Sequence, residues 1–411
     1  MTSMKTGSEE GEAKHQRMRG WLEVFSAFLK LGLTSFGGPI AHLGYFHREI
    51  VAKRRWIDEA HYAQLVALCQ FLPGPASSQL GFSLGLLRAG WLGGLAAFVA
   101  FTLPSVLLLL AFAHVMPRLQ EPYGRAALHG LKLLAVAVVA QGVLTMAQRL
   151  TPDLRRRLIA IGAAAVVIAT STALGQLGVI AAGAIAGVLL CRGSQLREIS
   201  QLKPAYGPRA GLILLSAFAV LLIASIALTS ESWPLTSVAA AFYRAGALVF
   251  GGGHVVLPLL QESVVNPGWV DVDDFLAGYG AAQAVPGPMF SLAAFLGARL
   301  LGVSATVGAA TSVLAIFLPG LLLVAGMLPF WHAIARAQRA ASAIAGVNAA
   351  VVGVLAAALY DPVWTSAVHG WSDVAIAGVG LVLLSATRTP VLAVLATCVL
   401  ASIASYAISS V

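Results

Sequence analysis

The segment FGGPIAHLGYF, Phe36 to Phe46, is followed by QFLPGPASS, Gln70 to Ser78, and this combination occurs twice in the chain. The second copy reads FGGGHVVLPLL, Phe250 to Leu260, followed by QAVPGPMFS, Gln283 to Ser291. The two Phe-Gly-Gly motifs lie 214 positions apart, and the two Pro-Gly-Pro motifs lie 213 apart. The sequence is therefore an internal duplication, and the two copies are expected to adopt equivalent structures.

Both motifs interrupt long apolar runs. Glycine weakens a helix, and proline removes a backbone donor and clashes with the preceding turn. In lipid, a broken helix is tolerated only where its freed backbone groups face protein or a water-filled cavity. Two broken segments at corresponding positions of two halves therefore predict a transporter whose substrate site lies near the bilayer midplane.

The composition predicts a polytopic all-α membrane protein. Of 411 residues, 58% are hydrophobic and only 10% are charged, whereas a soluble domain carries about 25% charged residues. The net charge of +9 is expected from basic cytoplasmic loops rather than from nucleic-acid binding. Cys69, Cys191 and Cys398 lie in apolar contexts and are predicted to be buried hydrophobic residues. No nucleotide-binding motif is visible, and no cofactor is expected.

The chain contains six apolar segments, followed by a single apolar segment and then by six more. We expect a cytoplasmic tail at 1–20, a first repeat at 21–191, a basic linker with a connecting helix at 192–236, and a second repeat at 237–411. The expected segments are Trp21–Phe46, Tyr62–Leu87, Trp91–Met116, Ala126–Ala147, Leu158–Ser171, Leu174–Leu190, Leu212–Leu228, Ser237–Leu260, Phe275–Leu301, Ala305–Phe330, Ala341–Tyr360, Val374–Ser385 and Val391–Ile408. Because six segments plus one reverse the side of entry, the repeats are predicted to have inverted topology.

The loop charges predict a cytoplasmic N-terminus and an external C-terminus, because most basic loops then lie inside. Two loops disagree. Lys53-Arg54-Arg55 would lie outside, and the acidic loop 261–274 would lie inside. Both disagreements vanish if the two broken segments of each repeat are re-entrant hairpins, and we favour this version.

The predicted anion site combines cations with helix N-termini. Lys30 and Arg244 occupy equivalent positions about two turns before their Phe-Gly-Gly motifs, and an intramembrane cation is by default a functional hypothesis. The alternative is that both side chains reach the membrane interface. Pro75 and Pro288 are expected to begin helices whose free N–H groups face an anion; proline-kinked packing is the alternative. The predicted substrate-binding residues are Lys30, Gly37, Gly38, Gln70, Gly74, Pro75, Ser78, Arg244, Gly251, Gly252, Gln283, Gly287, Pro288 and Ser291.

Three further polar residues have weaker assignments. His42 and His254 follow the glycine pairs and are candidates for proton coupling, although a lone histidine is more often a satisfied core residue. Lys132 lies within an apolar segment and is expected to add to a basic lining. The string Asp271-Val272-Asp273-Asp274 is the one feature that supports a membrane-embedded enzyme, and as a motif it is weak.

The residues FGGPIAHLGYFHREIV, 36–51, and QFLPGPASSQLGFSLG, 70–85, resemble the chromate ion transporter family, and the second half resembles the second repeat of that family. The resemblance implies a two-domain secondary transporter and antiporter of a bacterial inner membrane. It implies export of chromate from the cytoplasm, driven by the proton motive force, which confers chromate resistance. Sulfate would be a related oxyanion, and a homodimer is a further expectation. Transport of another oxyanion, such as sulfate or molybdate, and an enzyme using the acidic string remain alternatives.

Overall fold

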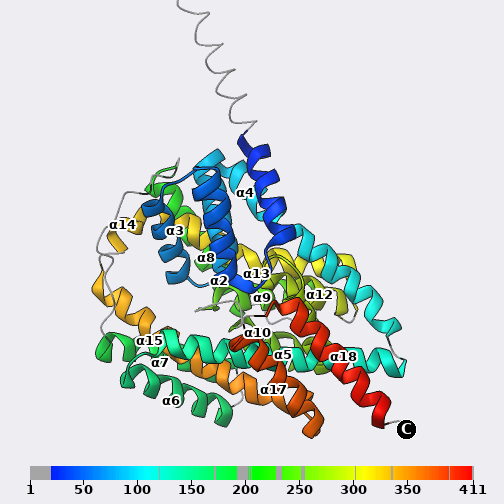
Figure 1. The fold of residues 1–411 in the computed structure, drawn as a ribbon. Coiled ribbons are helices and arrows are strands. Elements are labelled where there is room, and N and C mark those ends of the chain that lie inside the picture. Colours follow the sequence, from blue (N-terminus) through cyan, green and yellow to red (C-terminus); the bar gives the residue numbers. More distant parts are fainter. Residues whose placement is uncertain are drawn as a thin grey trace, which may run out of the picture.

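The computed structural model is all-helical over the residues it describes, which are 20–119, 121–170, 173–191, 202, 204, 206–227, 234–250, 255–300, 302–334, 337–387 and 389–409. The first half contains a helix at 20–34, α2 (Gly38–Phe46), η1 (His47–Lys53), α3 (Glu59–Phe71), α4 (Ala76–Val115), α5 (Pro122–Leu150), α6 (Leu154–Thr170) and α7 (Ala173–Leu190). After α8 (Pro208–Ala227), the second half contains α9 (Pro234–Ala247), α10 (Val256–Leu260), η4 (Gln261–Val265), α11 (Val272–Ala284), η5 (Met289–Ser291), α12 (Leu292–Arg299), α13 (Ala305–Met327), α14 (Trp331–Ile334), α15 (Gln338–Ala358), α16 (Thr365–Ala367), α17 (Trp371–Ser385) and α18 (Val391–Ser409) (Figure 1).

The protein is a multi-pass membrane protein. Within the described residues, six helical stretches are long and apolar enough to cross a bilayer. They are Ala76–Arg118, Pro122–Leu150, Pro208–Ala227, Ala305–Phe330, Gln338–Ala367 and Val391–Ile408. The three cysteines are buried, as the sequence predicts.

The two broken segments of the first repeat both return to the end of the fold at which the helix of residues 20–34 begins. Glu23, in the first turn of that helix, accepts hydrogen bonds from the Trp56 indole at 3.1 Å and from Arg88 at 3.1 Å. Arg54 lies 3.5 Å from the same carboxylate. The loop after η1 and the end of the first part of α4 therefore lie beside Glu23. This is the arrangement that re-entrant hairpins require, although the side of the membrane on which it lies stays a prediction.

The second repeat contains an equivalent hairpin around its Pro-Gly-Pro motif. Asp274 in the first turn of α11 accepts hydrogen bonds from Arg299 at the end of α12, at 2.8 and 2.6 Å. Asp58 and Asp271, which are equivalent in the two repeats, both cap helices with their side chains: Asp58 caps α3 and Asp271 caps α11. Local sequence therefore fixes the start of this helix in the same way in both halves.

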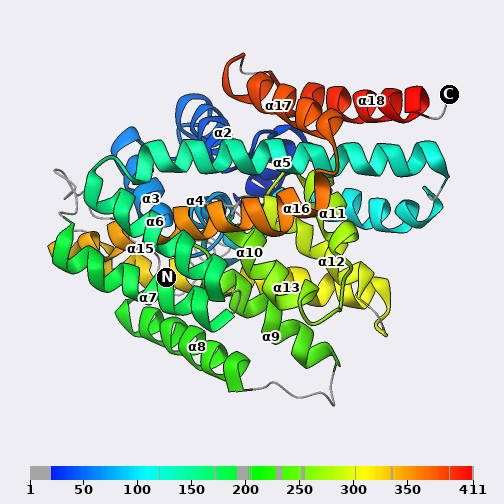
Figure 2. The same ribbon diagram turned by 90° about the horizontal axis from the view of Figure 1, so that it is seen from below.

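Three helices of each repeat pack against helices of the other repeat. Helix α5 packs against α17 and α18 of the second repeat, whereas its counterpart α15 packs against α6 and α7 of the first. Figures 1 and 2 show both groups: α15 runs beside α6 and α7, and α17 and α18 lie along α5. Close approach of small residues permits the packing, since a Cβ on Gly346 of α15 would lie 2.0 Å from the Gly183 carbonyl oxygen of α7. The two repeats therefore form one interlocked body.

Candidate functional site

The predicted helix breaks are present, and glycine is what permits them. Gly37 and Gly38 have φ angles of 93° and 76°, and Gly74 and Gly287 have φ angles of 120° and 106°. These values lie in the region that side-chain-bearing residues rarely adopt. Gly251 and Gly252, the equivalents of Gly37 and Gly38, lie outside the described residues, as does His254.

The Pro-Gly-Pro break of each repeat is hydrogen-bonded to the other repeat. The backbone N–H of Gly74 donates to the carbonyl oxygen of Val249 at 2.7 Å, and the N–H of Gly287 donates to that of Ser35 at 2.9 Å. Gly74 is equivalent to Gly287, and Ser35 is equivalent to Val249. Each repeat donates this hydrogen bond to the other and accepts the same one in return. Such reciprocal contacts are typical of a local two-fold relation between the two breaks. The breaks thus meet at the centre of the duplicated fold.

The two helix starts differ. Pro75 is the N-cap of α4, so a helix begins directly after the first break, as the sequence predicts; the first part of α4 ends at Arg88, before the non-helical residues Ala89 and Gly90. Pro288 is followed by the three-residue 3₁₀ turn η5, and α12 begins only at Leu292. Pro288 therefore begins a helical stretch, as expected, but the first turn of that stretch is 3₁₀: Ser291 donates its N–H to the Pro288 carbonyl oxygen at 3.0 Å.

A cavity of about 280 Å³ adjoins the first break. Its lining residues are Pro39, Leu43, Cys69, Gln70, Leu72, Gly74, Ala76, Thr145, Met146, Arg149, Leu150 and Asn348. They come from α2, α3, the start of α4, the end of α5, and α15 of the other repeat. The lining contains one cation, two side-chain amides and a hydroxyl, and it contains no carboxylate. Such a set of donors suits an anion.

Buried polar atoms without hydrogen-bond partners gather in the same half of the protein. Among the described residues they include the hydroxyls of Ser35 and Ser78, the amide oxygen of Gln79 and both ring nitrogens of His42. The backbone of Ser35 lies beside the His42 ring, which packs edge-on against Phe101 with centroids 5.4 Å apart. A buried polar group without a partner is costly. This group therefore indicates a region built to contact water, protons or a solute.

The equivalent region of the second repeat is satisfied internally. Ser291, the equivalent of Ser78, lies with its hydroxyl 2.6 Å from that of Ser105. Gln283, the equivalent of Gln70, donates its side-chain amide to the sulfur of Met289 at 2.7 Å. Among the described residues, the two Pro-Gly-Pro breaks thus differ in their polar partners, and the cavity described above adjoins the first break.

Lys30 and Arg244 are not among the residues that line this cavity. The Lys30 side chain is 54% exposed, and its ammonium lies 3.0 Å from the buried carboxylate of Glu49. Arg54 also binds Glu49, at 3.0 Å. Arg244 donates to the backbone carbonyl oxygen of Ser225 on α8. Both predicted cations therefore have protein partners, and their proposed role in binding an anion stays a prediction.

Lys132 and the acidic string also have structural partners. Lys132 forms an ion pair with Asp273 at 2.5 Å, and its side chain is 12% exposed. Asp274 binds Arg299, and Asp271 caps α11. Asp273 and Asp274 thus hold α11 to α5 and α12, and Asp271 caps the start of α11.

The sequence interpretation missed Arg149 and Glu49 as important residues. Arg149 lies beyond the expected segment 126–147, whereas α5 continues to Leu150. Asn348 is the repeat equivalent of Lys132, so the alignment of the two halves was a usable signal for it. Arg149 and Asn348 come from different repeats and line one cavity, and no local sequence pattern predicts that they meet.

The family model described as chromate transporter matches residues 22–188 and again residues 236–403. The chain belongs to the chromate transporter family. It is 31% identical over 340 residues to a probable chromate transport protein of Synechococcus elongatus, covering 81% of this chain and 82% of that protein. It is 27% identical over 345 residues to the chromate transport protein of Pseudomonas aeruginosa, covering 82% and 80%. These relatives are named as transport proteins rather than enzymes. No solved structure matches the chain significantly.

Proposed function

We propose that this member of the chromate transporter family exports chromate from the cytoplasm across a bacterial inner membrane, using the cavity beside Gly74 as its substrate site. The observation that carries the proposal is the lining of that cavity, which offers one guanidinium, amides of Gln70 and Asn348, and no carboxylate. Family membership and the names of the relatives support chromate as the solute.

The charge available at the cavity fits a dianion. Arg149 supplies one positive charge, and the N-terminus of α4 adds about half a charge through its free N–H groups. The first intrahelical acceptor is Pro75, which binds the N–H of Gln79 at 2.9 Å. The N–H groups of the first turn at residues 76–78 therefore point toward the break. Chromate would retain a small residual negative charge, which permits release during transport.

The position of the cavity along α5 supports the proposed direction. Arg149 is in the last turn of α5, close in sequence to Arg155-Arg156-Arg157. The positive-inside rule assigns that end of the protein to the cytoplasm. The cavity would then load its solute from the cytoplasm, as an exporter requires.

Coupling to the proton motive force is proposed through His42. Its ring is fully buried, the backbone of Ser35 lies beside it, and within the described residues neither nitrogen has a partner of good hydrogen-bond geometry. Histidine is the side chain whose unperturbed titration lies nearest to neutral pH. Its place in α2, which also contributes Pro39 and Leu43 to the cavity, puts a titratable group in the same segment as the solute site.

The test is uptake of radiolabelled chromate into inverted membrane vesicles, with and without an imposed pH gradient. The proposal predicts saturable uptake that the pH gradient stimulates and that vesicles lacking the protein do not show. Competition by sulfate and molybdate ranks the oxyanions. Uptake of sulfate with no uptake of chromate would instead support the alternative substrate, and the absence of uptake of any oxyanion would refute transport in this direction.

A further inference from the structure

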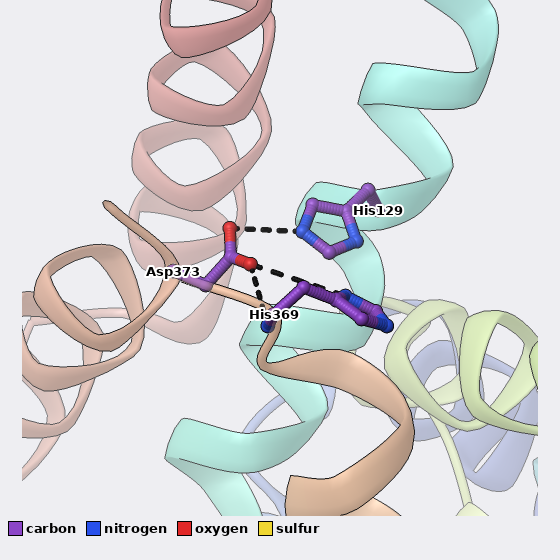
Figure 3. Close-up of side chains that lie close together, drawn as sticks. All are labelled: His129, His369 and Asp373. Carbon is purple, nitrogen blue, oxygen red and sulfur yellow. Dashed lines mark hydrogen bonds and ion pairs between the residues drawn. The ribbon is translucent and has the colours of Figure 1, made fainter. Parts of the chain in front are cut away.

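His129, His369 and Asp373 form a cluster (Figure 3) beside the half of α5 opposite the half that lines the cavity. His129 comes from α5, His369 from the turn before α17, and Asp373 from the first turn of α17. The Nε2 atom of His129 lies 2.9 Å from Oδ1 of Asp373, and Nδ1 of His369 lies 4.0 Å from Oδ2. One potential ligand atom from each of the three residues lies within 4.8 Å of the others.

Helix capping accounts for only part of this cluster. Asp373 accepts the backbone N–H of His369 at 2.9 Å and binds His129, so the carboxylate fixes the start of α17 on α5. The imidazole of His369 takes no part in this capping. Its side chain is 65% exposed, it makes no hydrogen bond to the described residues, and it lies beside the His129 ring with centroids 5.7 Å apart. Two imidazoles and one carboxylate thus lie close together, and helix capping gives no structural reason for the His369 imidazole.

We propose that these three side chains bind a divalent transition-metal cation of the zinc class. Imidazole nitrogen and carboxylate oxygen are ligands for Zn²⁺, Ni²⁺ and Cu²⁺, whereas Mg²⁺ and Ca²⁺ prefer sites made of oxygen alone. Zinc lies about 2.0–2.2 Å from such ligands, so tetrahedral ligands are separated by roughly 3.4 Å. The existing 2.9 Å separation between His129 and Asp373 is already close to that spacing. Rotation of the exposed His369 ring would bring the third ligand into place.

The surroundings leave room for the rest of the coordination shell. A cavity of about 490 Å³ opens beside the cluster and is lined by His129 and Asp373 together with Arg125, Ser402, Ser405 and Tyr406. Water can therefore complete the shell. Arg125 is the cation of this cavity; it is exposed, so solvent screens its repulsion of a metal ion. A metal ion competes with protons for imidazole and carboxylate ligands, so binding weakens as the pH falls.

The experiment titrates ZnCl₂ into the full-length protein in detergent, purified through a tag without histidine and freed of metal by chelation, using isothermal calorimetry at pH 7.5 and pH 6.0. We expect one equivalent of Zn²⁺ to bind at pH 7.5, with at least about tenfold weaker binding at pH 6.0. His369→Gln should weaken binding at least about tenfold with little change in thermal stability, because this ring is 65% exposed and makes no hydrogen bond to the described residues. Cobalt absorption provides a second readout of the ligand set.

Two variants serve as matched controls. Arg125→Gln alters the same cavity but leaves the three ligands intact, and His114→Gln removes an exposed histidine that bonds only to the Leu110 carbonyl oxygen within the described residues. Both should bind Zn²⁺ within about threefold of wild type. Absence of a one-equivalent site in the wild type, unchanged binding in His369→Gln, or loss of binding in Arg125→Gln would each overturn the proposal.

Discussion

Replacing Gly74 with alanine tests whether the break between α3 and α4 is held by close contact with the other repeat. The φ angle of Gly74 is 120°, and an added Cβ would lie 2.9 Å from Nε2 of Gln79 and 3.0 Å from the Cα of Gly320. A left-handed backbone costs a side-chain-bearing residue roughly 1–2 kcal/mol. Forcing atoms into a packed region adds roughly 1–3 kcal/mol. The substitution should therefore destabilise the fold by about 2–5 kcal/mol in total.

Gly38 provides the matched control, because it separates strain from contact. Its φ angle is 76°, but an added Cβ would meet nothing within 4 Å. Gly38→Ala should therefore lose only the backbone contribution, and Gly44→Ala, in α2 with open space and an ordinary helical backbone, should be neutral or stabilising. The assay is the apparent melting temperature of detergent-purified protein, followed by chromate uptake. If Gly74→Ala is no less stable than Gly38→Ala, the tight contact between the repeats at this break does not exist.

Two further predictions concern the charged end of the first repeat. Burial acts to raise the pKa of Glu49, but its bonds with Lys30 and Arg54 outweigh burial and hold that pKa below its ordinary value. This stabilisation is complete above the unfolded pKa of about 4.3 and is lost as the pH falls through the folded pKa. Glu49→Gln should therefore lower the melting temperature at pH 7 by a few degrees. The difference in melting temperature between variant and wild type should shrink below about pH 4. Equal shifts at both pH values would contradict this account. Cysteines placed at Arg54 and at Asp273 in a cysteine-free background should react differently with an impermeant thiol reagent added outside, with labelling at Asp273 only; labelling at Arg54 only would remove the re-entrant topology.

Much of the architecture could be predicted because its causes are local or repeated. The described glycines at the breaks permit the positive φ angles found there, and Asp58 and Asp271 cap equivalent helices. The contact of the loop at 53–55 with Glu23 agrees with the hairpin expected from charge, and the cytoplasmic side of this loop stays a prediction. The length of the apolar run likewise predicted α8 to within a few residues; this helix has no sequence counterpart in either repeat.

The binding site was less predictable because its groups come from distant parts of the chain. Lys30 is a lone cation in sequence, and only the fold shows that η1 brings Glu49 to within 3.0 Å of it. Arg149 is unremarkable at the end of a segment until α15 of the other repeat places Asn348 on the same cavity. Ser105 of the first repeat is equivalent to Gly320 of the second. The two breaks differ because Ser105 offers a hydroxyl partner to Ser291, whereas Gly320 has no side chain to offer Ser78.

The most direct test of the central claim is the concentration dependence of initial chromate uptake in inverted vesicles containing wild-type protein, Arg149→Gln, Arg149→Lys or Lys30→Gln. A full charge about 6 Å from a dianion contributes several kcal/mol at an effective dielectric constant of about 20, and solvent at the exposed Arg149 reduces this. The account predicts that Arg149→Gln raises the half-saturating chromate concentration by about tenfold to a hundredfold, that Arg149→Lys raises it less, and that Lys30→Gln leaves it unchanged. An unchanged value in Arg149→Gln together with a raised value in Lys30→Gln would contradict the account and place the anion beside Lys30 instead.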